Sequence, residues 1–154
     1  MIQRKQTLFL IVAFLLTLAL TYVSLGTFSG PNGIFELNFY SLQDITDAEN
    51  PVLVYYLMPL AAVTITSIVL NFLSIVLFKN RPLQMRVCGI NVGIQLGLSF
   101  IIFYLENTIA GDIEVDWTFC YAPLMPILAA VLCFFAYRAI SDDEALIQSL
   151  NRLR

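Results

Sequence analysis

The stretch Gly89-Ile-Asn-Val-Gly-Ile-Gln-Leu-Gly97 decides the fold of this protein. Its three glycines are spaced four residues apart, and so are the two amides between them, Asn91 and Gln95. At about 100° per residue, the glycines form a narrow stripe on one side of a helix, and Asn91, Gln95 and Ser99 fall on roughly the opposite side. Small residues at this spacing let helix backbones approach closely, and amides hydrogen-bond across helices in membranes. The stretch therefore predicts a helix in lipid with two faces that avoid lipid.

The composition supports a membrane protein. The chain has 154 residues, of which 59% are hydrophobic and 12% are charged, and this is too apolar for a soluble domain of this size. Four apolar runs without Asp, Glu, Lys or Arg are close to or above the roughly 20 helical residues that cross a bilayer. They cover residues 7–25, 52–78, 87–105 and 119–137. The sequence thus predicts an all-α membrane fold in which residues 1–140 form a bundle of four transmembrane helices.

The basic residues orient this predicted bundle. All 8 Lys and Arg residues fall in the N-terminus, the 79–86 connection and the C-terminal tail, which four spans would place on one side. Short cationic segments stay in the cytoplasm, so both termini are predicted to be cytoplasmic. The first run also resembles a signal peptide, with Ser24-Leu25-Gly26 as a small-residue cleavage site. Its apolar core is longer than is usual for such a peptide, which favours an uncleaved anchor.

A polar ladder is predicted between the second and third spans. Counting at 1.5 Å per residue places Asn71 about 10 Å from the inner end of its helix, a depth between those of Asn91 and Gln95 in the antiparallel neighbour. The predicted ladder consists of Ser67, Asn71, Ser74, Asn91, Gln95 and Ser99. Adhesion between helices is the favoured role, because polar paths usually contain an ionisable group inside the membrane. The alternative is a polar path or a ligand site. The Gly89, Gly93 and Gly97 stripe is expected to pack within the chain, with homodimerisation as the second possibility.

The loops on the other side suggest a small cap. After the turn signal Gly30-Pro31-Asn32-Gly33, apolar and polar residues alternate over 35–39, and a similar alternation covers 112–117. We expect these two segments to pair as a two-stranded cap. Asn50-Pro51 is expected to begin the second helix, as a capping side chain followed by a proline in the first turn.

The C-terminal tail, residues 141–154, is predicted to be a separate cytoplasmic amphipathic helix. Ser141-Asp-Asp-Glu144 has the pattern of a capping box. The predicted partner-binding residues of the tail are Leu146, Leu150, Leu153, Arg152 and Arg154. Because so short a helix is not stable alone, its apolar stripe must be covered by the inner leaflet, by the bundle or by a protein partner.

Signals for catalysis and for bound groups are lacking in the sequence. There is no His, and no paired intramembrane carboxylates or Gly-rich phosphate loop is visible. The outer acidic residues do not have the converging spacing of a calcium site. Cys88, Cys120 and Cys133 are too far apart to pair. We therefore expect no catalytic residues, cofactor, metal or nucleic-acid partner. The leading hypothesis is a non-enzymatic accessory or interaction protein; the alternative is a small-solute transporter or channel subunit that acts as an oligomer.

The two ends of the chain resemble a known family. Met1-Ile-Gln-Arg4 and Arg138-Ala-Ile-Ser-Asp-Asp-Glu-Ala-Leu-Ile-Gln-Ser-Leu-Asn-Arg-Leu-Arg154, combined with four spans in about 150 residues, look like a bacterial family of small integral membrane proteins known as domain of unknown function 4293. The resemblance extends over the whole chain. It implies an inner-membrane protein, provides no activity or cofactor to transfer, and points to a functional surface at the cytoplasmic ends of the chain.

Overall fold

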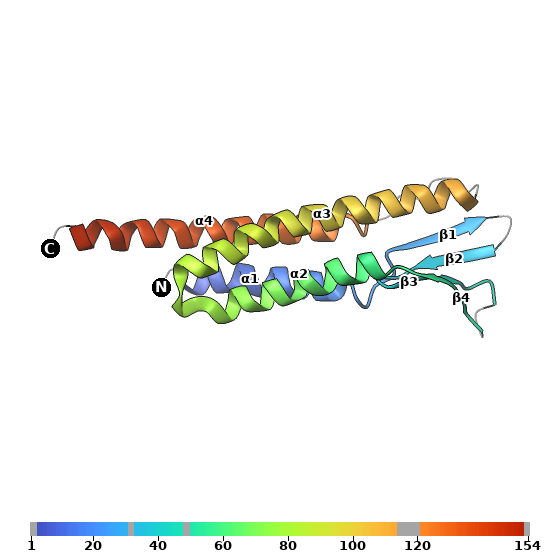
Figure 1. Cartoon of the computed structure of the whole chain (residues 1–154), viewed down its shortest axis with the longest axis horizontal. Helices are drawn as coiled ribbons and strands as arrows, with labels where there is room; N and C mark the ends of the chain where they lie inside the picture. The colour runs from blue at the N-terminus through green and yellow to red at the C-terminus, as the bar shows by residue number, and fades with distance from the viewer. Residues whose placement is uncertain (1–2, 31–32, 48–49, 114–120, 153–154) are drawn as a thin grey trace.

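Four helices run along one axis, and a small sheet lies at one end of them (Figure 1). The computed structural model describes residues 3–30, 33–47, 50–113 and 121–152. The helices are α1 (Gln3–Ala19), α2 (Met58–Val76), α3 (Arg81–Ile113) and α4 (Leu124–Arg152), and a 3-10 turn, η1 (Leu77–Lys79), joins α2 to α3. Both ends of the chain and η1 lie at the end of the molecule opposite the sheet.

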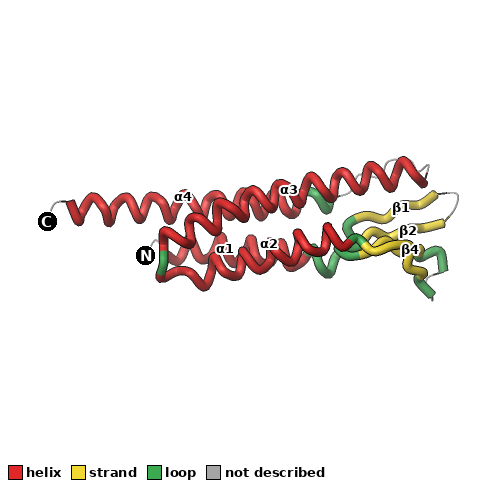
Figure 2. Tube along the Cα trace, in the orientation of Figure 1, coloured by secondary structure: helices red, strands yellow, loops and turns green. Residues whose placement is uncertain are grey.

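The sheet contradicts the all-α prediction. Its four antiparallel strands lie in chain order between α1 and α2 (Figure 2): β1 (Gly26–Gly30), β2 (Gly33–Leu37), β3 (Ser41–Asp44) and β4 (Val52–Tyr56). The fold is therefore four helices with a four-stranded sheet, and not a pure four-helix bundle. Of these strands only β2 lies in a segment where alternation predicted one. Its partners are β1 and β3, whereas α3 remains helical to Ile113, and residues 114–120 lie outside the described ranges. Both edges of β2 are therefore already paired, so the predicted pairing of 35–39 with 112–117 is wrong.

The second apolar run begins as a strand and not as a helix. Val52, Tyr55 and Tyr56 are β-branched or aromatic residues that favour the pleated surface of a sheet, and they pair with β3. Helix α2 begins later, at Met58, with Pro59 in its first turn. Proline is well tolerated there because the first amide of a helix has no intrahelical partner. The predicted helix start at Asn50-Pro51 is wrong, since hydrophobicity alone does not separate a membrane helix from a strand that continues into it.

Residues 44–46 form a corner at the end of β3, where the chain lies against the start of β2. The Thr46 amide donates to Asp44 Oδ1 at 2.9 Å, and the Thr46 hydroxyl accepts from the Ile34 amide at 3.0 Å. Gly33 faces the same hydroxyl with φ at 138°, and a Cβ built on Gly33 would run into it. The hydrogen bonds from Thr46 lower the pKa of the Asp44 carboxyl below its ordinary value. The corner therefore requires glycine at position 33 and is held by an ionised aspartate.

The predicted separate tail helix is also wrong. Helix α4 runs without a break from Leu124 to Arg152, so Ser141 lies inside it and does not cap a new helix. The cap is not needed because the preceding turns already supply helical carbonyls to the amides of residues 142–144. The tail is thus a rigid extension of the last helix.

Three of the described helices are long and apolar enough to cross a membrane: Met58–Lys79, Arg81–Gly111 and Leu124–Leu146. The apolar part of α1, Gln6–Ala19, is shorter, which corrects the prediction of four full-length spans. Large side chains such as Ile65, Phe100 and Leu128 are more than half exposed on the helices. Soluble monomers rarely present so much apolar surface, so the helices are suited to contact with lipid.

Two apolar clusters support this arrangement. The first joins the sheet to the sheet-side half of α3, where Phe28, Leu37 and Leu42 pack with Leu98 and Ile102. The second lies toward the termini and is built mainly from small residues of α1, α3 and α4. Between them, the helices enclose polar side chains.

Candidate functional site: a polar network enclosed by four helices

A chain of buried hydrogen bonds links α2 and α3 in the middle of the bundle. The Ser67 hydroxyl donates to Asn91 Oδ1 at 3.1 Å, and Asn91 Nδ2 donates to Asn71 Oδ1 at 2.7 Å. All three side chains are fully buried. The structure thus brings together Ser67, Asn71 and Asn91 of the predicted ladder.

The network extends to the first helix through Thr17. The Thr17 hydroxyl accepts from Asn71 Nδ2 at 2.9 Å and from Gln95 Nε2 at 2.8 Å, and it donates to the Ala13 carbonyl at 2.7 Å. This hydroxyl therefore uses its donor and both of its lone pairs. Among the described residues, Gln95 Oε1 is buried without a hydrogen-bond partner. Gln95 is thus held to Asn71 through Thr17.

The fourth helix contributes a thiol. Cys133 Sγ donates to Asn71 Oδ1 at 3.2 Å, and Asn91 Nδ2 lies 3.8 Å from the same sulfur. Cys133 and Cys88 are both free and buried, and Cys120 lies outside the described ranges. All four helices therefore meet at the polar network, which we define as Thr17, Ser67, Asn71, Asn91, Gln95 and Cys133.

The remaining two ladder residues lie apart from this network. The Ser74 hydroxyl donates to Leu70 of its own helix at 2.8 Å, and the Ser74 carbonyl accepts from Gln84 Nε2 at 2.8 Å. The Ser99 hydroxyl donates to the Pro123 carbonyl at 2.7 Å and so links α3 to the start of α4. Both are buried, but their role is local helix contact.

Sequence reasoning missed Thr17 as a member of the network, although a signal was present. Gln6, Leu10, Ala13, Thr17 and Leu20 recur at spacings of four and three and are all buried, which is the pattern of one helix face. That face also contains Gln6, whose Nε2 donates to the Ala139 carbonyl at 2.9 Å and to Asp143 Oδ2 at 2.7 Å. The polar positions of this stripe identify where α1 contacts its neighbours.

The glycine stripe lies on the outside of the bundle. Gly89, Gly93 and Gly97 are exposed, and a Cβ built on any of them would have no atom within 4 Å of it. The close approach within the chain that their spacing permits is therefore not made. Helix α3 directs its amides inward and its glycines outward, which leaves a shallow seam on the surface.

The tail residues can be placed only in part. Leu146 lies on α4 and is 59% exposed. The side chains of Leu150 and Arg152, and both Leu153 and Arg154, lie outside the described residues. The hydrogen bond from Gln6 to Asp143 joins this part of α4 to α1. Beyond it, Ala145 and Leu146 are exposed, so the exposed part of the tail begins at about Ala145.

The chemistry of the polar network is that of hydrogen bonding between neutral groups. It contains two hydroxyls, three amides and one thiol, and none of its six members carries a carboxylate or an ammonium. In the described parts of the chain, no group of three or more His, Cys, Asp or Glu residues could hold a metal ion. The network is thus suited to joining helices.

The comparisons with known proteins agree with the sequence resemblance. One family model, described as a domain of unknown function (DUF4293), matches residues 2–153. The match extends over nearly the whole chain and so includes the sheet, the polar network and the tail. No curated protein matches the chain.

Proposed function

Because this chain belongs to the DUF4293 family, whose function is unknown, we propose its function from the geometry. We propose that it is a non-enzymatic accessory protein of a bacterial inner membrane, and that it binds a protein partner through the cytoplasmic end of α4. The observation that carries this proposal is the unbroken extension of α4 beyond the other helices (Figure 1).

The length of α4 supports a protruding surface. Its 29 residues span about 44 Å, whereas the hydrocarbon core of a bilayer is about 30 Å thick. The helix continues along the bundle axis and does not turn back or lie flat (Figure 2). Leu146 then lies at the end of the candidate span, beyond the other helices, and is 59% exposed. An exposed apolar side chain in this position is suited to contact with a protein partner.

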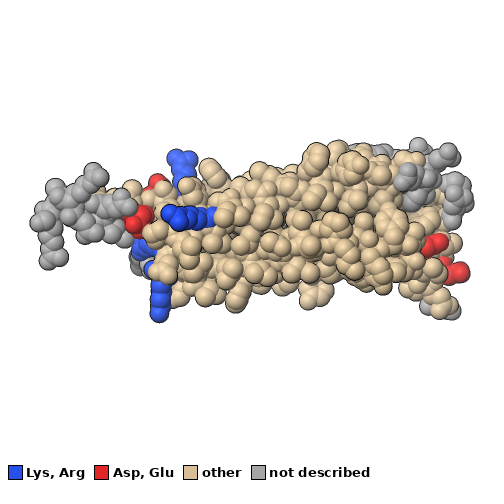
Figure 3. All heavy atoms as spheres, viewed as in Figure 1, with Lys and Arg blue, Asp and Glu red and all other residues tan. Residues whose placement is uncertain are grey.

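The charge distribution supports the proposed orientation. On the face drawn in Figure 3, the described Lys and Arg side chains gather at the end of the molecule opposite the sheet, and the middle carries no charge. Loops rich in Lys and Arg remain cytoplasmic, which supports the proposal that this end faces the cytoplasm and that the sheet lies outside. Helix α1 then lies in the membrane beside the three longer helices.

Photo-crosslinking tests the partner-binding role. A photoreactive amino acid at position 146 of the full-length chain should produce one discrete adduct with another protein in intact cells. The same residue at Val54, which is exposed on β4, serves as the control. Truncation after Ala145 preserves the Gln6–Asp143 bond and should remove the partner from co-purification. Equal adduct patterns from positions 146 and 54, or only self-adducts, would contradict the proposal.

The second candidate function, an oligomeric transporter or channel subunit, is favoured by the exposed glycine stripe. Gly93→Leu fills a seam that has no neighbour within the chain, so the fold should tolerate it. If copies pack through this seam, the variant should become monomeric in detergent, while Leu128→Phe on the exposed surface of α4 should not change the oligomeric state. Solute flux into liposomes that depends on Gly93 would support this second function, and a monomeric wild-type chain would reject it.

A further inference from the structure

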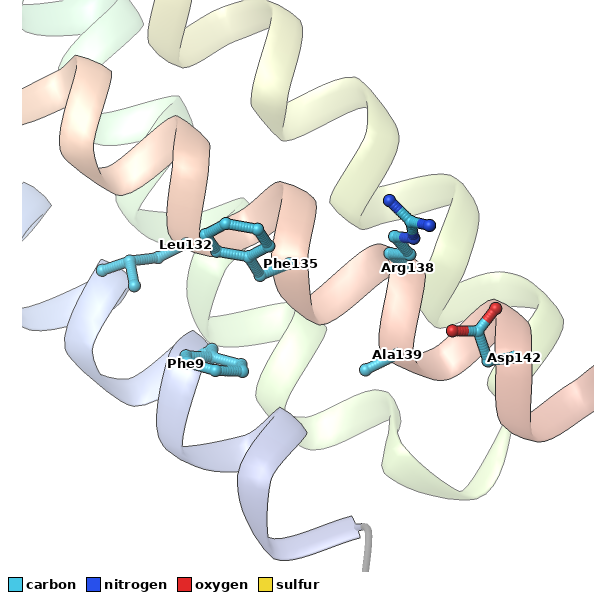
Figure 4. A pocket seen from close by; sticks show the side chains of 6 residues that line it. All are labelled: Phe9, Leu132, Phe135, Arg138, Ala139 and Asp142. Atoms are coloured by element: carbon cyan, nitrogen blue, oxygen red, sulfur yellow. The ribbon is translucent and has the colours of Figure 1, made fainter.

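A groove opens between α1 and α4 near the end of the molecule that holds the termini (Figure 4). Its volume is about 420 Å³, and its lining consists of Phe9, Leu132, Phe135, Arg138, Ala139 and Asp142. This volume is within the usual range of small-molecule sites. The polar network does not contribute to the groove, which is a separate feature of the surface.

The lining residues follow a chemical order along α4. Leu132 and Phe135 lie on the charge-free part of α4. Arg138 follows them along the helix, and Asp142 lies nearest to the C-terminal end. Arg138 is the first charged residue of α4, since residues 124–137 have none, so the charged end of the helix begins there and its guanidinium can reach the polar headgroups. Asp142 lies one helical turn, about 6 Å, farther out. The groove therefore presents apolar, cationic and anionic groups in sequence from the membrane outward.

A phospholipid with a primary amine presents the complementary groups in the same order. Its acyl chain is apolar, its phosphate is anionic, and its terminal ammonium is joined to the phosphate by a two-carbon link. We propose that this groove binds one phospholipid of the phosphatidylethanolamine class from the inner leaflet. An acyl chain lies against Phe9, Leu132 and Phe135, the Arg138 guanidinium donates to the phosphate, and the ammonium donates to the Asp142 carboxylate.

The surroundings of the groove leave these two charged groups available. Arg138 and Asp142 are both exposed, and Figure 4 shows both side chains at the rim, on the same helix. The adjacent carboxylate, that of Asp143, accepts from Gln6 Nε2 at 2.7 Å and so joins α4 to α1. Gln6 also bonds the Ala139 carbonyl at 2.9 Å, which fixes the two helices that form the walls. The inference rests on insertion of the helices in lipid and does not require the proposed partner.

Lipid competition measured by native mass spectrometry tests this inference. The full-length protein is delipidated in a nonionic detergent and incubated with equal amounts of phosphatidylethanolamine, phosphatidylcholine and phosphatidylglycerol that have identical acyl chains. The wild-type protein should retain phosphatidylethanolamine over the other two lipids, because only its headgroup offers Asp142 a hydrogen-bond donor that is also cationic. The choline ammonium has no N–H, and the glycerol hydroxyls of phosphatidylglycerol are neutral. Arg138→Gln should reduce its retention about tenfold, the effect of losing one charge-assisted contact. Asp142→Asn should abolish the preference over phosphatidylglycerol.

A matched control and a second variant keep the test decisive. Arg86→Gln removes an exposed cation from α3 at the same end of the molecule, outside the groove, and should leave retention unchanged. If Arg138→Gln inserts poorly into the membrane, a double variant replaces it. Arg138→Asp combined with Asp142→Arg preserves the total charge and should still lose the preference for phosphatidylethanolamine. Equal retention of the three lipids by the wild-type protein, or equal effects of Arg138→Gln and Arg86→Gln, would overturn the inference.

Discussion

At the scale of single residues, Asn71 is the side chain on which most bonds of the polar network meet. Its Oδ1 accepts from Asn91 and Cys133, and its Nδ2 donates to Thr17. Its amide therefore connects all four helices. Ser67, Asn71 and Asn91 could be predicted together because helical spacing and depth are both readable from an antiparallel pair of spans. Thr17 could not be placed in the same way, since hydrophobicity does not fix the rotation of α1.

Replacing Asn71 tests this connection. Asn71→Leu should lower the free energy of unfolding in mixed micelles by about 1–2 kcal/mol, because each bond in lipid contributes roughly 0.6 kcal/mol and the buried partners lose theirs. Thr66→Ala on the same helix is the control, since the Thr66 hydroxyl bonds Ala62 of its own helix on the exposed face. An equal loss of stability in both variants would show that Asn71 has no special role.

The Asp44 corner predicts a pH dependence of the sheet. Because hydrogen bonds from Thr46 lower the pKa of Asp44 in the folded state, the ionised carboxylate stabilises the corner at neutral pH. This contribution is present above the ordinary pKa of Asp, near ~3.9, and is lost as the pH falls through the lowered value. Protection of the Thr46 amide from hydrogen exchange should decrease on acidification. Asp44→Asn does not titrate, and its protection should remain constant over the same range.

At the scale of elements, α3 and α4 are longer than their apolar runs predict. Helix α3 continues to Ile113 beyond the predicted span end at Leu105, because the sheet packs beside it and buries Ile109 and Ala110. Helix α4 continues because nothing in residues 138–144 interrupts its backbone bonds. The sequence did not predict β1, β3 and β4. Strand β4 belongs to the same apolar run as α2, so hydrophobicity does not separate the two elements, and apolar and polar residues do not alternate clearly in β1 and β3.

Continuity of α4 can be measured directly. Spin labels at positions 131 and 145, with the native cysteines replaced by Ala, should report a single narrow distance near 21 Å, the length of 14 helical residues. Ser141→Pro removes an amide inside the helix and clashes with the Tyr137 carbonyl, at a cost of about 3 kcal/mol, so it should shorten and broaden the distribution. A wild-type distribution as broad as that of the variant would mean that the tail is a separate helix.

At the scale of the whole molecule, the number of membrane crossings decides which side of the membrane each end occupies. Helix α1 has 17 residues, about 25 Å, which is slightly less than the hydrocarbon thickness of about 30 Å. Its Thr17 nevertheless satisfies amides from α2 and α3. Withdrawing α1 from the bundle would leave Asn71 and Gln95 facing lipid, and this is unfavourable for unpaired polar groups. We therefore expect α1 to cross the membrane with the other helices.

The most direct test is the accessibility of the two ends and the sheet in intact cells. It uses an epitope tag before Met1 and single cysteines in place of Ser29 on β1 and Leu146 on α4, probed with an impermeant antibody or thiol reagent. Ser29→Cys should react in intact cells, whereas the tag and Leu146→Cys should react only after the inner membrane is opened. A tag that is accessible from outside while Leu146→Cys remains protected would mean that α1 does not cross, and would contradict the account.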